Sequence, residues 1–340
     1  MTRYKMKKIM PPVLFLISFA LFGCQDSPLN LPLENSVTDD LLRQRLHTVL
    51  EEGLQSEDAL HRCHALESMA EVAGPETPAK IRKFLHDPLP AVRFAAAVAA
   101  GDIQDHTAQP ILLQMMEDEN VSVRLAAGYA LEKLGDQRFE AWYDAALLGS
   151  DPALAGQSCF LLSKLGNKPP RQDSKAKLWQ ALRKKDQVVQ VRLQAAEALG
   201  RLGEEKVLKQ LLVYASSGYA DDRLIAISGL EYLGGPDVFA MLTTLADDPQ
   251  IEVQLAAIRA LGQRTEPTHL ELVRKSLFYE DPQGDAQAAE RIRGLAVLAL
   301  GRVGKKTDSS LLYRAMADRS QYLRLAAARA TIDYLKRKDR

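Results

Sequence analysis

The residues best suited to chemistry form a histidine–cysteine cluster within one predicted helix. His61 and His64 lie three residues apart and flank Arg62 and Cys63. Residues three apart share a helix face, so the two imidazoles could bind a transition metal. A stable site needs three or four ligands, and no Cys, His or Glu constellation elsewhere completes this one. We therefore predict no metal site and no cofactor.

The sequence also contains no motif typical of phosphate binding or of nucleophilic catalysis. There is no glycine-rich phosphate loop, no G-x-S-x-G element and no nucleophile beside an obvious base. Lys plus Arg and Asp plus Glu are 44 each, so the chain lacks the basic footprint of a nucleic-acid binder. We predict no catalytic residue, no enzyme activity and no nucleic-acid partner.

Cys24 has the surroundings of a lipid-attachment site. Four basic residues open the chain, namely Arg3, Lys5, Lys7 and Lys8. The apolar run 13–22 follows, which is too short to span a bilayer and typical of a signal peptide. It ends in the letters LFGC at Cys24, which resemble a bacterial lipobox. The resemblance implies that 1–23 is removed and that Cys24 carries the lipid. The alternatives are an ordinary signal peptide and a retained membrane helix.

The residues after Cys24 predict a location and a tether. By resemblance to enterobacterial lipoprotein sorting, Gln25 in place of Asp implies transfer to the outer membrane, facing the periplasm. Residues 24–40 hold two prolines and several turn formers, which is typical of a flexible tether. Three cysteines cannot build a disulfide framework.

From residue 41 onward the chain repeats one helical segment about nine times. The apolar residues recur at helical spacing, and one register position is usually arginine. The nine register positions are Arg62, Arg93, Arg124, Ala155, Arg192, Arg223, Gln254, Arg293 and Arg324. Three residues later every repeat has a small residue, alanine in eight and Ser158 in the other. Small residues in this column predict close approach of neighbouring helices.

Glycine then ends the first helix of most repeats, and a second helix follows. The predicted stops are Gly135, Gly166, Gly203, Gly234 and Gly304. Each repeat is thus a helical hairpin that buries its faces only by stacking on its neighbours. This pattern resembles the HEAT-repeat family, in the short form known from phycobilisome lyases, over about 57–335. The resemblance implies a right-handed all-α solenoid of about nine hairpins, and residues 41–54 are predicted to form a cap helix.

An aspartate six residues before the arginine also matches that family. The matching pairs are Asp87 and Arg93, Asp118 and Arg124, Asp186 and Arg192, and Asp318 and Arg324. The resemblance implies that these side chains form a ladder between successive repeats, which is a structural role. A likeness to HEAT-repeat iron hydroxylases lacks their metal ligands, because no histidine is followed by glutamate.

A partner-binding groove is the remaining candidate site. By family resemblance the second helices line the concave face, and their polar column is its floor. The predicted groove residues are Lys83, Gln114, Tyr143, Gln180, Thr243, Lys275 and Arg314. Trp142 and Trp179 are further aromatic candidates, since Trp and Tyr dominate interface hot spots, although both also suit a core. Cys63 and Cys159 fall in apolar columns and are predicted to be buried.

Two insertions interrupt the repeat spacing. Residues 167–173 lengthen a turn inside the fourth repeat, and residues 279–289 lengthen the link between the seventh and eighth. Insertions in repeat arrays often carry binding function, and a tolerated surface loop is the alternative. Asp281 and Asp285 in the second insertion match no calcium-binding spacing.

These observations favour a lipid-anchored scaffold or adaptor that holds a protein partner in the bacterial envelope. An elongated solenoid offers extended contact area. Two other readings stay open, namely a small-ligand-binding protein similar to the bilin lyases and a structural spacer between outer membrane and cell wall.

Overall fold

The computed structural model describes residues 37–338 except 73, 167–172 and 185, and this part contains helices and turns but no strand. The predicted all-α solenoid is confirmed. The predicted signal peptide 1–23, Cys24 and most of the tether 24–40 lie outside the described residues. Within the described ranges, no helix has both the length and the hydropathy that a bilayer crossing requires.

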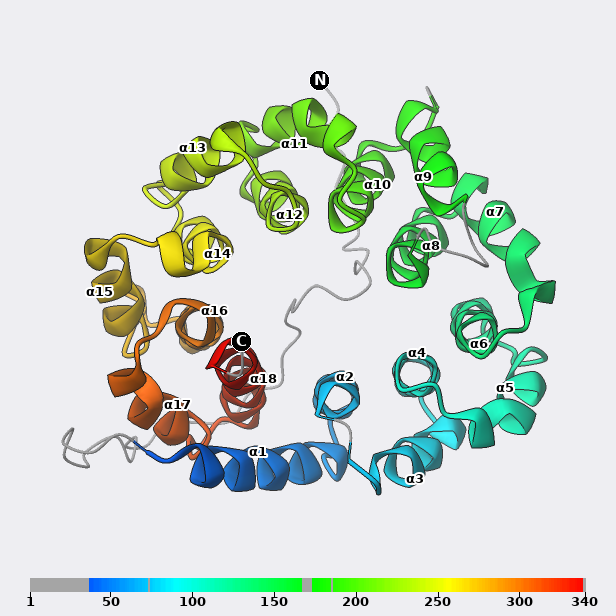
Figure 1. Cartoon of the computed structure of the whole chain (residues 1–340), viewed down its shortest axis with the longest axis horizontal. Coiled ribbons are helices and arrows are strands. Elements are labelled where there is room, and N and C mark those ends of the chain that lie inside the picture. Colours follow the sequence, from blue (N-terminus) through cyan, green and yellow to red (C-terminus); the bar gives the residue numbers. More distant parts are fainter. Residues whose placement is uncertain (1–36, 73, 167–172, 185, 339–340) are drawn as a thin grey trace.

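The helices alternate along the chain between an outer and an inner ring (Figure 1). The outer ring contains α1 (Asp39–Leu54), α3 (Thr77–Arg82), α5 (Gln109–Met115), α7 (Glu140–Leu148), α9 (Ser174–Arg183), α11 (Leu208–Ala215), α13 (Pro236–Leu245), α15 (Pro267–Ser276) and α17 (Ser309–Ala315). The inner ring contains α2 (Ala59–Glu71), α4 (Pro90–Asp102), α6 (Val121–Lys133), α8 (Pro152–Leu165), α10 (Val189–Arg201), α12 (Ala220–Leu230), α14 (Ile251–Leu261), α16 (Ala286–Val303) and α18 (Gln321–Lys338). Short 3-10 turns adjoin several outer helices, at Lys83–His86, His106–Ala108, Gln137–Phe139, Glu205–Val207, Gly262–Arg264 and Lys306–Asp308.

Polar residues start many of the helices. The side chain of Thr38 accepts a hydrogen bond from the Leu41 amide at 3.4 Å, so α1 begins at Asp39, two residues before the predicted start. Asp58, Asp151 and Asp285 cap α2, α8 and α16 in the same way. Such caps satisfy amide groups that have no partner inside the helix.

The inner helices approach one another very closely. The small column three residues after the register position is buried in every repeat. Near the ends of the inner helices, glycines remove even the β-carbon. A β-carbon added at Gly101 would lie 2.8 Å from Ala130 Cα, and one at Gly200 would lie 2.5 Å from the Gly229 carbonyl oxygen. Close inner packing shortens the inner circumference relative to the outer one, and this curves the array.

The curvature closes the array on itself, because α18 contacts both α1 and α2 (Figure 1). Gln321 of α18 donates to the Glu52 carbonyl oxygen at 3.2 Å, and Arg45 of α1 donates to the Met316 carbonyl oxygen at 3.0 Å. Glu71 forms ion pairs with Arg329 and, at 2.7 Å, with Lys336. The helix predicted as a terminal cap therefore also packs against the last repeat.

A run of charged residues such as 336–340 suggests a solvated tail from the sequence alone, but this is wrong for residues 336–338. These residues form the last turn of α18. Lys338 pairs with Asp39 at the start of α1, and Arg337 donates to the carbonyl oxygens of Arg302 and Gly304. The seam between the first and last repeats is thus polar at its edge.

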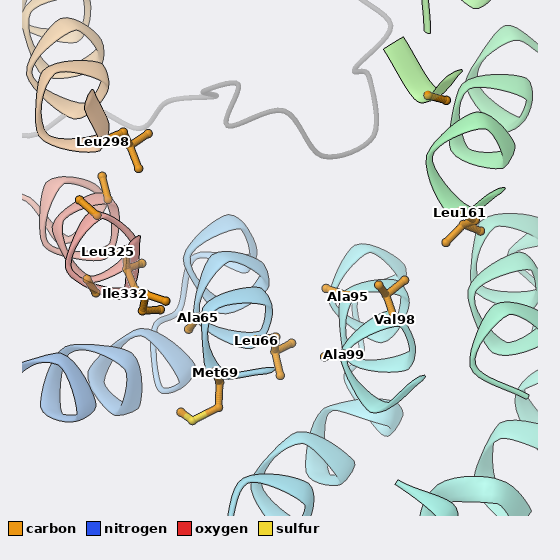
Figure 2. Close-up of a cluster of buried hydrophobic side chains, with 14 of the residues drawn as sticks. Ala65, Leu66, Met69, Ala95, Val98, Ala99, Leu161, Leu298, Leu325 and Ile332 are labelled. Carbon is orange, nitrogen blue, oxygen red and sulfur yellow. The ribbon is translucent and has the colours of Figure 1, made fainter. Parts of the chain in front are cut away.

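Apolar side chains fill the space between the two rings and continue through the seam. In Figure 2, Leu325 and Ile332 lie on the side of α18 that faces α2, the helix that carries Ala65. On α1, Leu42, Leu46 and Leu50 are at most 2% exposed. The hydrophobic core is therefore one belt that runs around the ring.

Candidate interaction surfaces

The arginine ladder lies between consecutive hairpins, as a structural element. Its side-chain pairs are Arg62 with Asp87 at 3.1 Å, Arg93 with Asp118 at 2.8 Å, and Arg223 with Asp248 at 2.8 Å. Each arginine also donates to backbone carbonyl oxygens in the turn before its own helix. The ladder therefore holds the turns that lead into the inner helices.

Charge and hydrogen bonding explain the pKa shifts of the Arg93–Asp118 pair. Burial alone would raise the pKa of Asp118, but hydrogen bonds from Arg93 and the Asn120 amide outweigh burial and lower that pKa. The same pairing raises the pKa of Arg93. Both partners are therefore charged near neutral pH.

Three ladder residues depart from the predicted pairing. The side chain of Asp186 is 80% exposed, and Arg192 donates instead to the Leu182 carbonyl oxygen at 3.1 Å. Arg124 lies over the Trp142 ring, 5.9 Å from its centroid. The position that would supply its aspartate, by the spacing of the other pairs, is Gly149.

The last rung lies across the seam. Arg324 donates to the Asp318 carbonyl oxygen at 2.9 Å, and its Nε lies 3.4 Å from a carboxylate oxygen of Glu52 on α1. The side chain of Asp318 accepts from the Ser320 amide at 2.8 Å. Arg324 thus uses the first outer helix in place of a following repeat.

The expectation that the second helices line the concave face is wrong. The seven predicted groove residues lie on α5, α7, α9, α13, α15 and α17 and in the 3-10 turn after α3, which all belong to the outer ring (Figure 1). Lys83, Gln114, Gln180 and Lys275 are exposed there, and Thr243 and Arg314 are half-buried. The first helices line the inner face, because they carry the small residues that permit the closest packing.

The aromatic candidates are also distributed differently. Tyr143 is fully buried and belongs to the core, so it cannot anchor a partner on the surface. Trp142 is 39% exposed on the outer ring. Trp179 is half-buried, and the Arg183 guanidinium covers it at 4.5 Å from the ring centroid.

Sequence reasoning missed a set of polar side chains on the inner helices. They lie eight or nine residues after the register position, where the repeat pattern gave no signal because their types vary. Lys164 of α8 reaches Asp102 of α4 at 2.8 Å, and Arg302 of α16 reaches Glu231 beside α12 at 3.1 Å. These ion pairs join inner helices that are not consecutive, so they brace the inner ring.

A second ladder on the outer ring was also missed. Arg82 pairs with Asp105 at 2.6 Å and Arg274 pairs with Asp308 at 2.9 Å. Both aspartates are buried and lie just before the next outer helix. The two pairs lie 23 and 34 residues apart in the sequence, so a periodicity search does not separate them from ordinary surface charge.

Burial shifts the pKa values of the cysteine and histidine cluster. Burial raises the pKa of Cys63 to about 12, and its thiol donates to the Ala91 carbonyl oxygen at 3.4 Å. Burial lowers the pKa of His61. Cys159 is buried, as predicted from its column, whereas Cys63 is half-buried and departs from that prediction. Among the described residues, no group of three or more His, Cys, Asp or Glu side chains is placed to hold a metal ion.

One face of the ring collects exposed apolar side chains. We call it the N-terminal rim, because it consists of the turns that lead into the inner helices and the first residues of those helices. Its exposed large apolar residues are Leu89, Val121, Val188, Val189, Tyr219 and Phe278. Equivalent positions of a ring of repeats lie on the same face, so these side chains share one rim.

The family model for HEAT repeats matches residues 48–136 and 211–291, together half of the chain. The chain belongs to the HEAT-repeat family. No curated protein sequence matches it significantly.

Solved HEAT-like structures resemble this HEAT-repeat chain at low identity. Human deoxyhypusine hydroxylase is 19% identical, with a TM-score of 0.37 over 77% of this chain and 96% of that one. The complex of CpcE and CpcF of phycocyanin lyase from Nostoc is 18% identical, with a TM-score of 0.30 over 93% of this chain and 99% of that one. YibA of Escherichia coli is 16% identical, with a TM-score of 0.37 over 80% and 96%.

The two insertions of this HEAT-repeat array have different outcomes. Residues 167–172 lie outside the described residues. In the second insertion, Asp281 accepts hydrogen bonds from the Gln283 and Asp285 amides, and Asp285 caps α16. These bonds occupy both aspartates within the turn, and the predicted absence of a calcium-binding arrangement stays a prediction.

Proposed function

We propose that this chain is a lipid-anchored HEAT-repeat scaffold that holds a protein partner in the bacterial envelope, without catalysis. The observation that carries the proposal is the row of exposed apolar side chains on the N-terminal rim. Exposed apolar groups gathered on one face are typical of interaction surfaces. The ladder arginines beneath them hold the backbone, which leaves the rim side chains available.

The start of the ring supports an orientation for this scaffold. Asp39 pairs with Lys338 at the C-terminal end of α18, so α1 begins at the rim opposite to the N-terminal rim. Cys24 lies 15 residues before Asp39, a stretch that spans up to ~50 Å when extended. Lipidation of Cys24 would then place the N-terminal rim away from the outer membrane, toward the periplasm.

The lipid anchor has a direct test. Cells grown with an alkyne analogue of palmitate should label the wild-type chain, and Cys24→Ser should abolish the label and release the chain from the membrane fraction. Equal labelling of wild type and Cys24→Ser would refute the anchor.

The scaffold role is tested by in-cell crosslinking, affinity purification and mass spectrometry, again with Cys24→Ser as the comparison. We expect one stoichiometric envelope protein that is enriched with the wild type and lost from the unanchored variant. No enrichment in either sample contradicts the scaffold and favours the spacer. A coloured or ligand-bearing protein after purification favours the small-ligand alternative.

A further inference from the structure

Four consecutive turns of the N-terminal rim have an excess of acidic side chains, and three of them also expose large apolar side chains. They are the turns into α10, α12, α14 and α16, and we call their exposed side chains the acidic arc. Its apolar members are Val188, Val189, Tyr219 and Phe278, which are 45%, 59%, 76% and 51% exposed. Phe278 directly precedes the second insertion of the repeat array.

Each of the four turns also carries an exposed acid. These are Asp186, Asp221, Asp247 and Glu280, and the side chains of Asp186 and Asp247 are 80% and 77% exposed. The described basic residues near them are Arg183, which lies over the Trp179 ring, Lys184, whose Nζ donates to the Leu148 carbonyl oxygen at 2.9 Å, and Lys275 in the last turn of α15. The four turns also contain Asp222, Asp248, Asp281 and Asp285, so acids outnumber basic residues and the excess charge is negative.

Several acids of these turns have structural duties and are not counted in the arc. Asp248 belongs to the arginine ladder, Asp285 caps α16, and Asp222 accepts from the Ser217 hydroxyl at 2.7 Å. The four arc acids cap no helix. Asp247 contacts His269 at 3.2 Å, and Asp186 lies 3.9 Å from Lys184.

The arc has the length of a helical ligand. Helices α10, α12, α14 and α16 are consecutive neighbours in the inner ring (Figure 1). Neighbouring helices pack about 8–10 Å apart, so the four turns span ~30 Å. A helix of about 20 residues has the same length.

We propose that the acidic arc docks a basic amphipathic segment of the partner protein, with Lys or Arg side chains interleaved with large apolar ones. This inference rests on the proposed scaffold function and names the chemistry of its partner. Apolar side chains of the segment cover Tyr219, Phe278 and the two valines, and its cations meet the four acids. The acidic arc of a second copy of this chain, an anionic membrane and a nucleic acid each bring negative charge to this surface and are repelled.

The proposal is tested by the fluorescence anisotropy of a labelled peptide titrated with the full chain. The probe is an amphipathic peptide of about 18 residues made of lysine and leucine, and its match has glutamate at every lysine. We expect the lysine peptide to bind at least tenfold more tightly than the glutamate peptide, with affinity that falls as salt rises. Equal binding of the two peptides would overturn the proposal.

Two arc variants and two matched controls locate the binding. The arc variants are Asp186→Asn/Asp221→Asn/Asp247→Asn and Tyr219→Ser/Phe278→Ser. The controls are Glu205→Gln/Asp237→Asn/Glu266→Gln, which neutralises three exposed acids at the opposite rim, and Phe239→Ser, which removes a 40% exposed aromatic from α13. Each arc variant should weaken the lysine peptide at least tenfold, and each control less than twofold. Controls that weaken binding as much as the arc variants would show attraction by charge anywhere on the chain, and would refute the arc.

A crosslinking experiment in cells separates failure of the arc from failure of the scaffold. A photoreactive residue at position 219 should crosslink the protein that affinity purification enriches, and one at position 239 should not. Enrichment of a partner that crosslinks from 239 but not from 219 rejects the arc and keeps the scaffold. The same partner should lose crosslinking when its own basic segment is neutralised, and retention would also reject the arc.

Discussion

Replacing Gly301 of α16 with alanine tests how closely the inner helices approach. A β-carbon at this position would lie 2.7 Å from Ala330 Cα and 2.8 Å from the Ala330 carbonyl carbon on α18. Ordinary contacts of a β-carbon are 3.4–4 Å long, so α16 and α18 must separate by roughly 1 Å. The atoms in the way belong to the backbone, and no side-chain rotation relieves the clash.

Two opposing effects decide the sign of the change. Alanine gains about 1 kcal/mol over glycine inside a helix. Overpacking of a well-packed core costs about 1–3 kcal/mol, and the upper part of this range applies because a backbone must move. We expect Gly301→Ala to lower the free energy of unfolding by about 1–2 kcal/mol.

The assay is urea unfolding followed by circular dichroism, with Gly218→Ala as the matched control. Gly218 lies in an exposed turn, and a β-carbon there has no heavy atom within 4 Å. The control should stay within about 0.5 kcal/mol of the wild type. Because repeats can unfold separately, the slope of each curve is compared as well as its midpoint. If Gly301→Ala is as stable as the wild type while the control is also unchanged, the close packing of the inner helices is refuted.

Three further predictions concern the seam, the thiols and the ladder. Leu50→Ala truncates a fully buried side chain of α1, and in urea unfolding it should lower the free energy of unfolding by about 2–5 kcal/mol. Glu71→Gln at the seam should lower it by at most about 1 kcal/mol. A larger loss from Glu71→Gln would show that charge closes the ring. Burial raises the pKa of Cys63 and Cys159, so both thiols should react slowly with a thiol reagent until urea unfolds the chain, and rapid labelling of the folded chain contradicts their burial. Asp118 has a folded-state pKa below its unfolded value, so its charge stabilises the fold above the unfolded pKa, and this contribution is lost as pH falls through the folded pKa. The difference in stability between wild type and Asp118→Asn should therefore close below about pH 4. A difference that is constant from pH 7 to pH 3 would exclude the charge as its cause.

Much of the local structure follows from the sequence because its causes are local. Gly135, Gly166 and Gly203 were predicted as left-handed helix stops, and their φ angles are +101°, +83° and +64°. Gly304 ends α16 as predicted, but its φ is −60° and not left-handed, and Gly235 rather than Gly234 takes the left-handed conformation. Repeat periodicity locates a stop to within a residue, but the exact residue depends on how the chain enters the next helix.

The sequence does not predict which helices form the inner ring or that the ring closes. An amphipathic pattern states which side of a helix is buried, and both helices of each hairpin satisfy it equally. The choice between inside and outside depends on the distance between neighbouring hairpins, which the small residues near Gly101 and Gly301 set. The alanine column indicates that neighbouring helices pack closely, but by itself it does not say whether this close packing lies on the inner or the outer side of the array. Ring closure depends on the accumulated curvature of all hairpins, which no single repeat encodes.

The ladder explains why the rim can carry a specific surface on a repetitive fold. Arg223 donates to the Ser217 carbonyl oxygen at 2.9 Å and pairs with Asp248 of the next hairpin, so the turn into α12 is fixed from below by groups that do not reach its tip. Tyr219 at the tip is then 76% exposed, and the hydrogen bonds that it makes to Ser217 and Arg223 within the turn come from its backbone. A change of its side chain alters what the rim binds at little cost in stability. The same separation holds wherever a rung is present, and it makes the turns, rather than the inner helices with their bracing ion pairs, the part of the ring on which binding specificity can change freely.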